Sequence, residues 1–186
     1  MRVKARIVNG HYQLRCDQHL NLHQLKVLLP EGRLYMGRPT MLSCRLMGKR
    51  VLFFPSGTIQ VLAGNMTSMH FERLHAMICE LLTYSSTNPA VATVIRVSPW
   101  TVNNMVVYFE LCSTFTFSGL LCNGRLSYEP ELFPALLVSK KANVHVTLFQ
   151  NGKGVVTGVR SALKAIDALQ ELVLELRHRV RRRPTS

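Results

Sequence analysis

Short segments in which apolar and polar residues alternate give way twice along the chain to longer stretches with helical spacing. LFFPSGTIQVLAG, which starts at Leu52, consists of two strand-like runs joined by the turn PSG, and LFQNGKGVVTG, which starts at Leu148, repeats the arrangement with the turn QNG. Glycine turns between β-rich runs, above all Asn-Gly, are typical of β-hairpins. The pattern therefore predicts one hairpin in each half of the chain.

A long helix is predicted after each hairpin, over about residues 67–84 and 161–180, because apolar residues recur there at helical spacing. Thr67 or Ser68 is a suitable N-cap for the first helix. Shorter helices are predicted near residues 21–29 and 118–122, and SSTNPA at residues 85–90 has the composition of a linker. The apolar stripe expected to face the core in the second long helix consists of Leu163, Ile166, Leu169, Val173 and Leu176.

The two halves form an internal repeat with a period of roughly 90 residues. RLYMGRPTML from Arg33 is echoed by RLSYEPELFPALL from Arg125. Each half is expected to contain a strand, a short helix, several antiparallel strands and a long helix, which indicates an α+β fold. We expect repeats at residues 1–92 and 93–180 and a basic tail at residues 181–186. Both long helices would cover one face of the sheet and leave the other face free for a partner.

Charge narrows the choice of partner. Twenty-three Lys and Arg stand against ten Asp and Glu, which gives a formal net charge of +13, and the basic residues are spread over both halves. This excess favours nucleic acid, an acidic protein surface or an anionic membrane. A hydrophobic content of 47% excludes a disordered chain. No secretory signal is visible, and no apolar run reaches the roughly 18–20 residues that a membrane span needs.

Metal and disulfide chemistry are not indicated. The cysteines are odd in number and form no CxxC pair, so we expect reduced, mostly buried thiols: Cys16, Cys44, Cys79, Cys112 and Cys122. His19 and His23 would share a helix face, yet no third ligand accompanies them. We therefore expect no metal and no cofactor.

Enzymatic chemistry is not indicated either. The carboxylate pairs Glu129 with Glu131 and Asp17 with Glu31 have no neighbouring base. No G-x-S-x-G, P-loop or GxGxxG motif occurs, and QNGKG at residues 150–154 lies in a hairpin turn and not before a helix. The chain is therefore not expected to be an enzyme.

SYEPELFPALL at residues 127–137, followed by LFQNGKGVVTG, resembles the second repeat of the TATA-box-binding protein family. NNMV at residues 103–106 stands where that family begins the same repeat, and CDQHLNL at residues 16–22 is similar to the divergent TBP-like members. The resemblance implies two pseudo-symmetric repeats that form a saddle. Its curved antiparallel sheet would sit on the DNA minor groove, with the helices on the convex face.

For the second repeat, the resemblance implies that Phe133 and Phe149 insert between base steps and that Lys153 meets a phosphate. Asn104 and Thr157 would lie at base edges, and Val106 and Val155 would pack on the groove floor. Strand alternation independently puts Thr147 and Phe149 on one face, and Lys153, Val155 and Thr157 together. Wedges, apolar filler, hydroxyls and a cation are what binding to an A·T-rich minor groove requires. The alternative is that these phenylalanines are core residues. The expected DNA contacts of this repeat are Asn104, Val106, Phe133, Pro134, Thr147, Phe149, Lys153, Val155 and Thr157.

The first repeat departs from this pattern. Phe54 takes one wedge position, while the other falls on Pro39 or Thr40. Arg6 is aligned with the family's asparagine and Thr58 with its phosphate-facing lysine, while Gln60 replaces an apolar contact. An extra residue near residues 61–63 predicts a β-bulge. Unstacking a base step costs free energy that contacts between the protein and the groove must offset. Because the first repeat has lost some of these contacts, we expect reduced TATA preference and more non-specific, salt-sensitive binding. The expected DNA contacts here are Arg6, Val8, Arg45, Phe54 and Ser56.

The resemblance also implies protein partners. Glu129, Glu131 and Leu132 match the loop that contacts transcription factor IIB in the family, whereas a contact with transcription factor IIA has no motif here. The free chain is expected to be nuclear and able to form a homodimer through the concave face. RHRVRRRP at residues 177–184 is a nuclear localisation signal, a phosphate clamp or a solvated tail. The alternative function is a protein-interaction adaptor of the same fold that does not itself read DNA.

Overall fold

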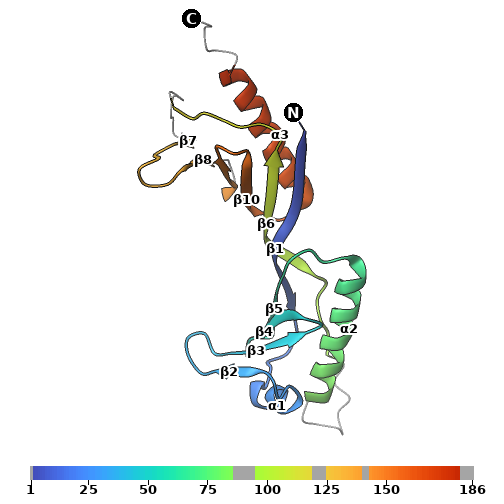
Figure 1. Cartoon of the computed structure of the whole chain (residues 1–186). Helices are drawn as coiled ribbons and strands as arrows, with labels where there is room; N and C mark the ends of the chain where they lie inside the picture. Colours follow the sequence, from blue (N-terminus) through green and yellow to red (C-terminus); the bar gives the residue numbers. More distant parts are fainter. Residues whose placement is uncertain (1, 86–94, 119–124, 140–142, 181–186) are drawn as a thin grey trace, which may run out of the picture. The chain divides into compact units, whose positions relative to one another are not determined.

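The computed structural model describes residues 2–85, 95–118, 125–139 and 143–180. Within these residues it contains ten strands and three helices, and the predicted α+β class is confirmed (Figure 1). Every strand pairing with a determined register is antiparallel. The elements are β1 (Val3–Arg15), α1 (Leu22–Leu28), β2 (Arg33–Tyr35), β3 (Met41–Leu46), β4 (Lys49–Phe53), β5 (Thr58–Ala63), α2 (Ser68–Ser85), β6 (Thr101–Leu111), β7 (Leu126–Ser127), β8 (Ala135–Ser139), β9 (His145–Phe149), β10 (Lys153–Val159) and α3 (Ala162–Val180).

The chain divides into two compact units. Residues 10–103 form what we call the first-repeat unit, and residues 1–9 with residues 104–186 form the second-repeat unit. β1 and β6 each contribute residues to both units. The unit boundaries fall inside β1 and β6 and do not coincide with the predicted repeat boundaries. The repeats at residues 1–92 and 93–180 therefore remain a prediction. The predicted tail at residues 181–186 lies outside the described residues.

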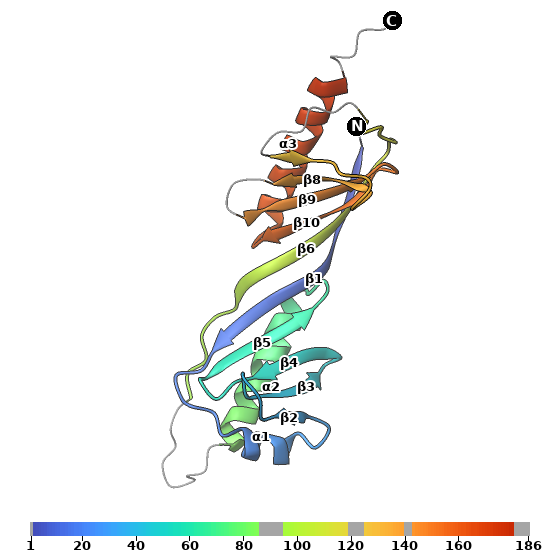
Figure 2. The same cartoon turned by 90° about the vertical axis from the view of Figure 1, so that its left-hand side faces the viewer.

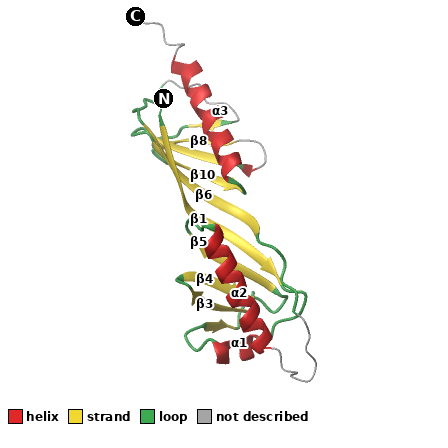
Figure 3. Ribbon diagram, turned by 90° about the vertical axis from the view of Figure 1, so that its right-hand side faces the viewer, coloured by secondary structure: helices red, strands yellow, loops and turns green. Residues whose placement is uncertain are grey.

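In the first-repeat unit the strand order is β2-β3-β4-β5-β1, and α2 lies along one face of these strands (Figures 2 and 3). Apolar residues at alternate positions of β1, β4 and β5 are fully buried, as are those on one side of α2. Tyr12 meets Phe71 of α2 edge-to-face with ring centroids 5.0 Å apart, and Phe71 meets Trp100 at 5.3 Å. The buried residues are Tyr12, Leu14, Val51, Phe53, Ile59, Val61, Leu74, Ile78 and Leu82.

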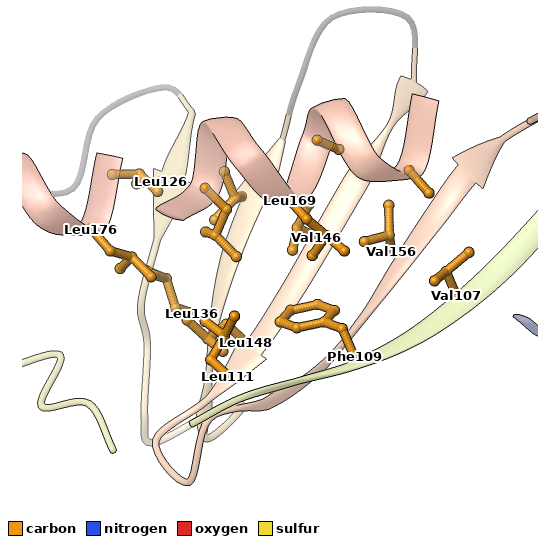
Figure 4. Close-up of a cluster of buried hydrophobic side chains, with 14 of the residues drawn as sticks. Val107, Phe109, Leu111, Leu126, Leu136, Val146, Leu148, Val156, Leu169 and Leu176 are labelled. Carbon is orange, nitrogen blue, oxygen red and sulfur yellow. The ribbon is translucent and has the colours of Figure 1, made fainter. Parts of the chain in front are cut away.

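In the second-repeat unit the order is β6-β10-β9-β8-β7, and α3 covers one face (Figure 4). Phe109 and the valines and leucines beside it in the sheet pack against the helix residues Ala165, Ala168, Leu169, Leu172 and Leu176. Burying such side chains contributes roughly 1.5–3 kcal/mol each, so this cluster holds α3 on the sheet. α3 is the one helix in the described part of this unit, so the opposite face of the strands carries no helix there.

The three helices confirm the predicted elements, with one difference in the helix stripe. Asn21 caps α1, since its side-chain oxygen accepts from the amides of His23 at 3.1 Å and Gln24 at 3.2 Å. In α3, however, Leu163 and Ile166 are 73% and 47% exposed. The smaller alanines take the core positions because positions 165, 168, 169, 172 and 176 follow one helical stripe. The helix predicted at residues 118–122 and the linker at residues 85–90 fall almost wholly outside the described residues.

The predicted bulge near residues 61–63 is wrong. β5 pairs with β1 in unbroken register from Thr58 to Ala63. The shift lies in β10 of the other unit, between Val156 and Val159. β10 has one residue more than β6 across this shift, and Gly158 lies within it with φ +78°. The Gly158 amide donates to the Asn104 side chain at 3.0 Å, which anchors the bulge.

Both predicted hairpin turns depend on a glycine with φ +81°, Gly57 in one unit and Gly152 in the other. A Cβ on Gly152 would lie 2.4 Å from the carbonyl oxygen of Ser113 and 2.5 Å from that of Leu111. L-residues are disfavoured in this left-handed region by roughly 1–2 kcal/mol even without a clash.

We predict that Gly152→Ala lowers the free energy of unfolding by at least about 2 kcal/mol, because strain and backbone clash add. Gly37→Ala is the control, since a Cβ there has nothing within 4 Å. Denaturant titration followed by circular dichroism measures both. Equal stability of the two variants would contradict the role given to this turn.

Candidate nucleic-acid interface

The uncovered face of the second-repeat unit is formed by alternate residues of β6, β8, β9 and β10. Register aligns Val155 with Tyr108 on one side and Thr147 on the other, and Leu137 follows Thr147. These side chains are half-buried or exposed, whereas most of their neighbours along each strand are buried under α3. The face consists of Asn104, Val106, Tyr108, Glu110, Leu137, Ser139, His145, Thr147, Phe149, Lys153, Val155 and Thr157.

Phe133 and Phe149, the expected wedge pair, lie together. Their ring centroids are 5.9 Å apart with an interplanar angle of 64°. Phe149 pairs with Ala135 in the sheet, and the Phe133 amide donates to the Glu129 carbonyl at 2.8 Å. Phe133 remains 43% exposed, and Pro134 beside it is exposed. Two aromatic rings therefore lie together at the end of an open sheet face and not in the core.

The side-chain amide of Asn104 is held so that its NH₂ group is free to donate hydrogen bonds. Its Oδ1 accepts from the Gly158 amide at 3.0 Å, which fixes the orientation of the side-chain amide. The NH₂ group is therefore the end left for other partners. Donors suit the minor groove of A·T pairs, which presents only the acceptors adenine N3 and thymine O2. Thr157, opposite His145, adds a hydroxyl in the neighbouring strand.

Tyr108 and Glu110 belong to this face, and the sequence analysis missed them. Tyr108 Oη donates to Glu110 Oε1 at 2.6 Å, and the Arg6 guanidinium lies 5.4 Å from the ring centroid of Tyr108. The hydrogen bond from Tyr108 lowers the pKa of Glu110, and the charges of Lys153, Lys4 and Arg6 lower it further. The same bond raises the pKa of Tyr108. Counting by twos from Asn104 would have found both residues.

The charge of Lys153 is therefore not isolated, because Lys153 lies directly opposite Glu110 across the β10–β6 ladder. A neighbouring carboxylate attracts the ammonium and also repels phosphate. The charge of Lys153, which the sequence analysis expects to meet a phosphate, is therefore partly offset by Glu110.

The corresponding face of the first-repeat unit is more polar. Gln60 of β5 lies opposite Gln13 of β1 and Leu52 of β4. Gln13 Oε1 accepts from Asn103 Nδ2 at 2.8 Å. Arg45 is exposed, as are Ser56 in the turn and Val8 in the other unit, whereas Phe54 is half-buried. The residues expected at this repeat thus lie at the surface of their units, except for the partly covered Phe54.

Matching hydrogen bonds align the two repeats. The Cys16 amide donates to the Gly57 carbonyl at 2.8 Å, and the Leu111 amide donates to the Gly152 carbonyl at 2.8 Å. Asn9 is separated from Asn104 by the same number of residues as Gly57 from Gly152. Asn9, and not Arg6, is therefore the counterpart of Asn104, and the alignment expected for Arg6 is wrong.

The same comparison selects Pro39 over Thr40 as the counterpart of Phe133. Phe133 stands two residues before Ala135, which pairs with Phe149. In the first repeat Leu42 pairs with Phe53, so the antiparallel register puts Met41 opposite Phe54. Pro39 stands two residues before Met41, as Phe133 stands two residues before Ala135. The first repeat thus has an aromatic ring at only one of the two wedge positions.

The loop before β8 presents the residues expected to contact protein. Glu129 and Glu131 are exposed, and Leu132 is 81% exposed. The amides of Leu132 and Phe133 both donate to the Glu129 carbonyl, at 3.0 Å and 2.8 Å. The loop is therefore an ordered turn that displays two carboxylates and one leucine beside the aromatic pair.

The cysteines and histidines show no shared site. Cys16 and Cys44 are buried and Cys79 is half-buried, but Cys112 is exposed, and Cys122 lies outside the described residues. Burial raises the pKa of the Cys44 thiol to about 11, so it is protonated at neutral pH. Within the part of the chain that the structure describes, no three metal-ligating side chains cluster, and no helix is long and apolar enough to cross a membrane.

Comparison with known proteins agrees with this geometry. Residues 99–178 match the family described as transcription factor TFIID (or TATA-binding protein, TBP). The TATA-box-binding protein of Pyrococcus horikoshii is 27% identical over 178 residues, covering 94% of this chain and 90% of that protein. The second half of the chain thus matches the TATA-box-binding protein family, and one protein of that name aligns with the chain along nearly its whole length. Proteins of this family are non-enzymatic DNA-binding factors, which agrees with the expectation from the sequence.

Other family relatives agree. TATA box-binding protein-like 2 of Takifugu rubripes is 31% identical over 85 residues, which cover 44% of this chain and 26% of that protein. The chain thus matches about a quarter of that relative's length. The structure of Methanococcus jannaschii TBP has a TM-score of 0.74 at 23% identity and covers 94% of this chain and 99% of its own length. The likeness shows that the TBP fold extends over nearly the whole chain.

We predict that Tyr108→Phe raises the pKa of Glu110 toward its ordinary value, because the hydrogen bond that lowers it is lost. Arg6→Gln should raise the pKa less, since Arg6 acts through space and solvent. NMR titration of the Glu110 carboxyl carbon measures both. An unchanged pKa in Tyr108→Phe would exclude the bond as the main cause.

Proposed function

We propose that this TBP-family protein binds promoter DNA in the minor groove and nucleates a transcription initiation complex. The observation that carries the proposal is the Phe133–Phe149 pair at the end of an uncovered sheet face that also presents Asn104 and Val155. Two rings supply the wedge, Asn104 supplies a donor for A·T acceptors, and Val155 supplies an apolar floor. The net charge of +13 supports association with the phosphate backbone.

We further propose that preference for TATA sequences is weakened. The first repeat has Pro39 where the second has Phe133, so one wedge is absent from the bending mechanism. Its open face also carries His11 and Gln13 at the positions of Val106 and Tyr108, and Gln13 is already bonded to Asn103. Each unstacked base step costs a few kcal/mol, and fewer contacts with the groove offset a smaller part of that cost. The retained Asn9 limits this loss but does not replace a ring.

The loop with Glu129, Glu131 and Leu132 is proposed to recruit transcription factor IIB. Carboxylates suit a basic partner surface, and an exposed leucine beside them provides an apolar anchor. On the same grounds we propose a nuclear location for the protein. A contact with transcription factor IIA has no further support in the described residues.

We predict that Phe133→Ala with Phe149→Ala weakens binding to a TATA duplex at least about 10-fold, since base–aromatic stacking contributes about 1–3 kcal/mol per base. Fluorescence anisotropy against TATA and G·C-rich duplexes measures this. Leu163→Ala with Leu174→Ala is the control, because it removes exposed apolar side chains from α3.

Wild-type binding should favour the TATA duplex modestly, and the preference should disappear in the aromatic double variant. Equal binding to both duplexes that the double variant leaves unchanged would reject groove binding by wedges. It would favour an adaptor that partners bring to DNA.

We predict that Glu129→Gln with Leu132→Ala abolishes the supershift of the protein–DNA complex by transcription factor IIB. DNA binding itself should stay within about 2-fold, because neither side chain lies on the sheet face. Gel mobility-shift titration measures both quantities. A normal supershift would refute this loop as the contact.

A further inference from the structure

The two repeats place their cations on different strands. In the second repeat Lys153 at the start of β10 lies opposite Glu110 of β6. At the matching position of the first repeat, Thr58 at the start of β5 lies opposite Arg15 of β1. The lysine lost at Thr58 is thus replaced by a cation on the neighbouring strand, and the carboxylate found beside Lys153 is absent from this pair.

Arg15 borders an open hollow at the end of the first-repeat unit. The hollow has a volume of about 450 Å³ and lies next to the β4–β5 turn that carries Phe54. A second arginine, Arg96, also lines it. The other lining residues that bear on its chemistry are Asp17, His19, Ser56 and Ser98.

The rim of this hollow is fixed by hydrogen bonds of the backbone. The Arg15 amide donates to Ser98 Oγ at 2.9 Å, and the Ser98 amide donates to the Arg15 carbonyl at 2.8 Å. Asp17 Oδ1 accepts from the Arg96 amide at 3.1 Å, so the one carboxylate in the hollow is already hydrogen-bonded. The segment that bears both arginines is therefore held in place before any ligand binds.

Both arginine side chains remain available. Arg15 and Arg96 are exposed, and among the described residues neither forms an ion pair with a carboxylate. A guanidinium presents a rigid fork of donors that matches phosphate oxygens. Two such groups around one hollow, with serine hydroxyls beside them, have the chemistry of a phosphate site.

We propose that this hollow binds a phosphate of the DNA backbone, with Arg15 as its main cation and Arg96 as the second. The inference rests on the proposed DNA-binding function. With this site the first repeat keeps a contact with the DNA backbone, which Thr58 alone would not provide. Its expected share of the binding affinity is therefore larger. The contact carries no base information, so it adds to binding of any sequence.

The test is the salt dependence of DNA binding by the full chain. Arg15→Gln should weaken binding to TATA and G·C-rich duplexes equally. It should also reduce the slope of log K against log salt by about 0.9, the value for one phosphate contact. The loss should then be about 3.5-fold larger at about 50 mM than at about 200 mM salt. Adding Thr58→Lys to Arg15→Gln should restore the slope, because it returns a cation to the same end of the sheet.

Arg73→Gln is the matched control, since it removes an exposed arginine from α2. Circular dichroism melts establish that the Arg15 variants fold, as expected for a residue whose side chain is exposed and whose hydrogen bonds are made by its backbone. A slope in Arg15→Gln equal to that of Arg73→Gln, with no rescue by Thr58→Lys, would overturn the site. If binding still depends on Phe133 and Phe149, the proposed function then stands without this site. If the wild-type chain binds neither duplex, both proposals fail.

Discussion

The register of the β-strands decides which side chains of each strand lie under a helix and which lie on the open face. Because successive side chains point to opposite sides, a slip of one residue would exchange the two sets. In the second-repeat unit this register buries Val107 and Phe109 under α3 and leaves Val106 and Tyr108 outside. The core and the candidate interface are therefore two consequences of one pairing pattern. The glycine turns hold that pattern, since Gly57 and Gly152 adopt a backbone conformation that other residues resist.

Electrostatics distinguishes two repeats that share one backbone plan. In the second repeat, Glu110 receives a hydrogen bond from Tyr108 and lies opposite Lys153, so charges of both signs lie on the open face. In the first repeat, Arg15 occupies the place of Glu110 and has no carboxylate opposite it. We therefore propose that the two repeats meet a polyanion differently. One combines aromatic wedges with a partly neutralised cation, and the other combines a single ring with less compensated positive charge.

This division suits a factor that fixes its position on DNA through one repeat and gains affinity through the other. Base-edge donors and inserted rings give sequence preference, whereas arginine–phosphate contacts give affinity that falls with salt. In the proposed mode of binding, Asn9 would keep one base-directed group in the first repeat, but Pro39 cannot stack as a phenyl ring does. The exposed acidic loop at residues 129–132 belongs to the same unit as the wedges, so partner recruitment is proposed to accompany the more specific end.

The sequence by itself determined the elements and most of the residues of the candidate second-repeat interface. Local patterns suffice for hairpin turns and for long helices, and YEPELFP marked the aromatic loop. Alternation along a strand then placed Thr147, Phe149 and Val155 on one face, because side-chain direction in a strand is a local property. The class of protein followed from these motifs and from the excess of positive charge.

Only the tertiary structure decided the features that depend on neighbouring strands. The choice of Asn9 over Arg6, the bulge at Gly158, the bond between Tyr108 and Glu110, and the pairing of Arg15 with Thr58 all require the register between distant segments. The helix stripe of α3 also differed, since alanines faced the core and Leu163 faced outward. Local sequence fixes where a side chain can point, but only packing between distant segments fixes what it meets.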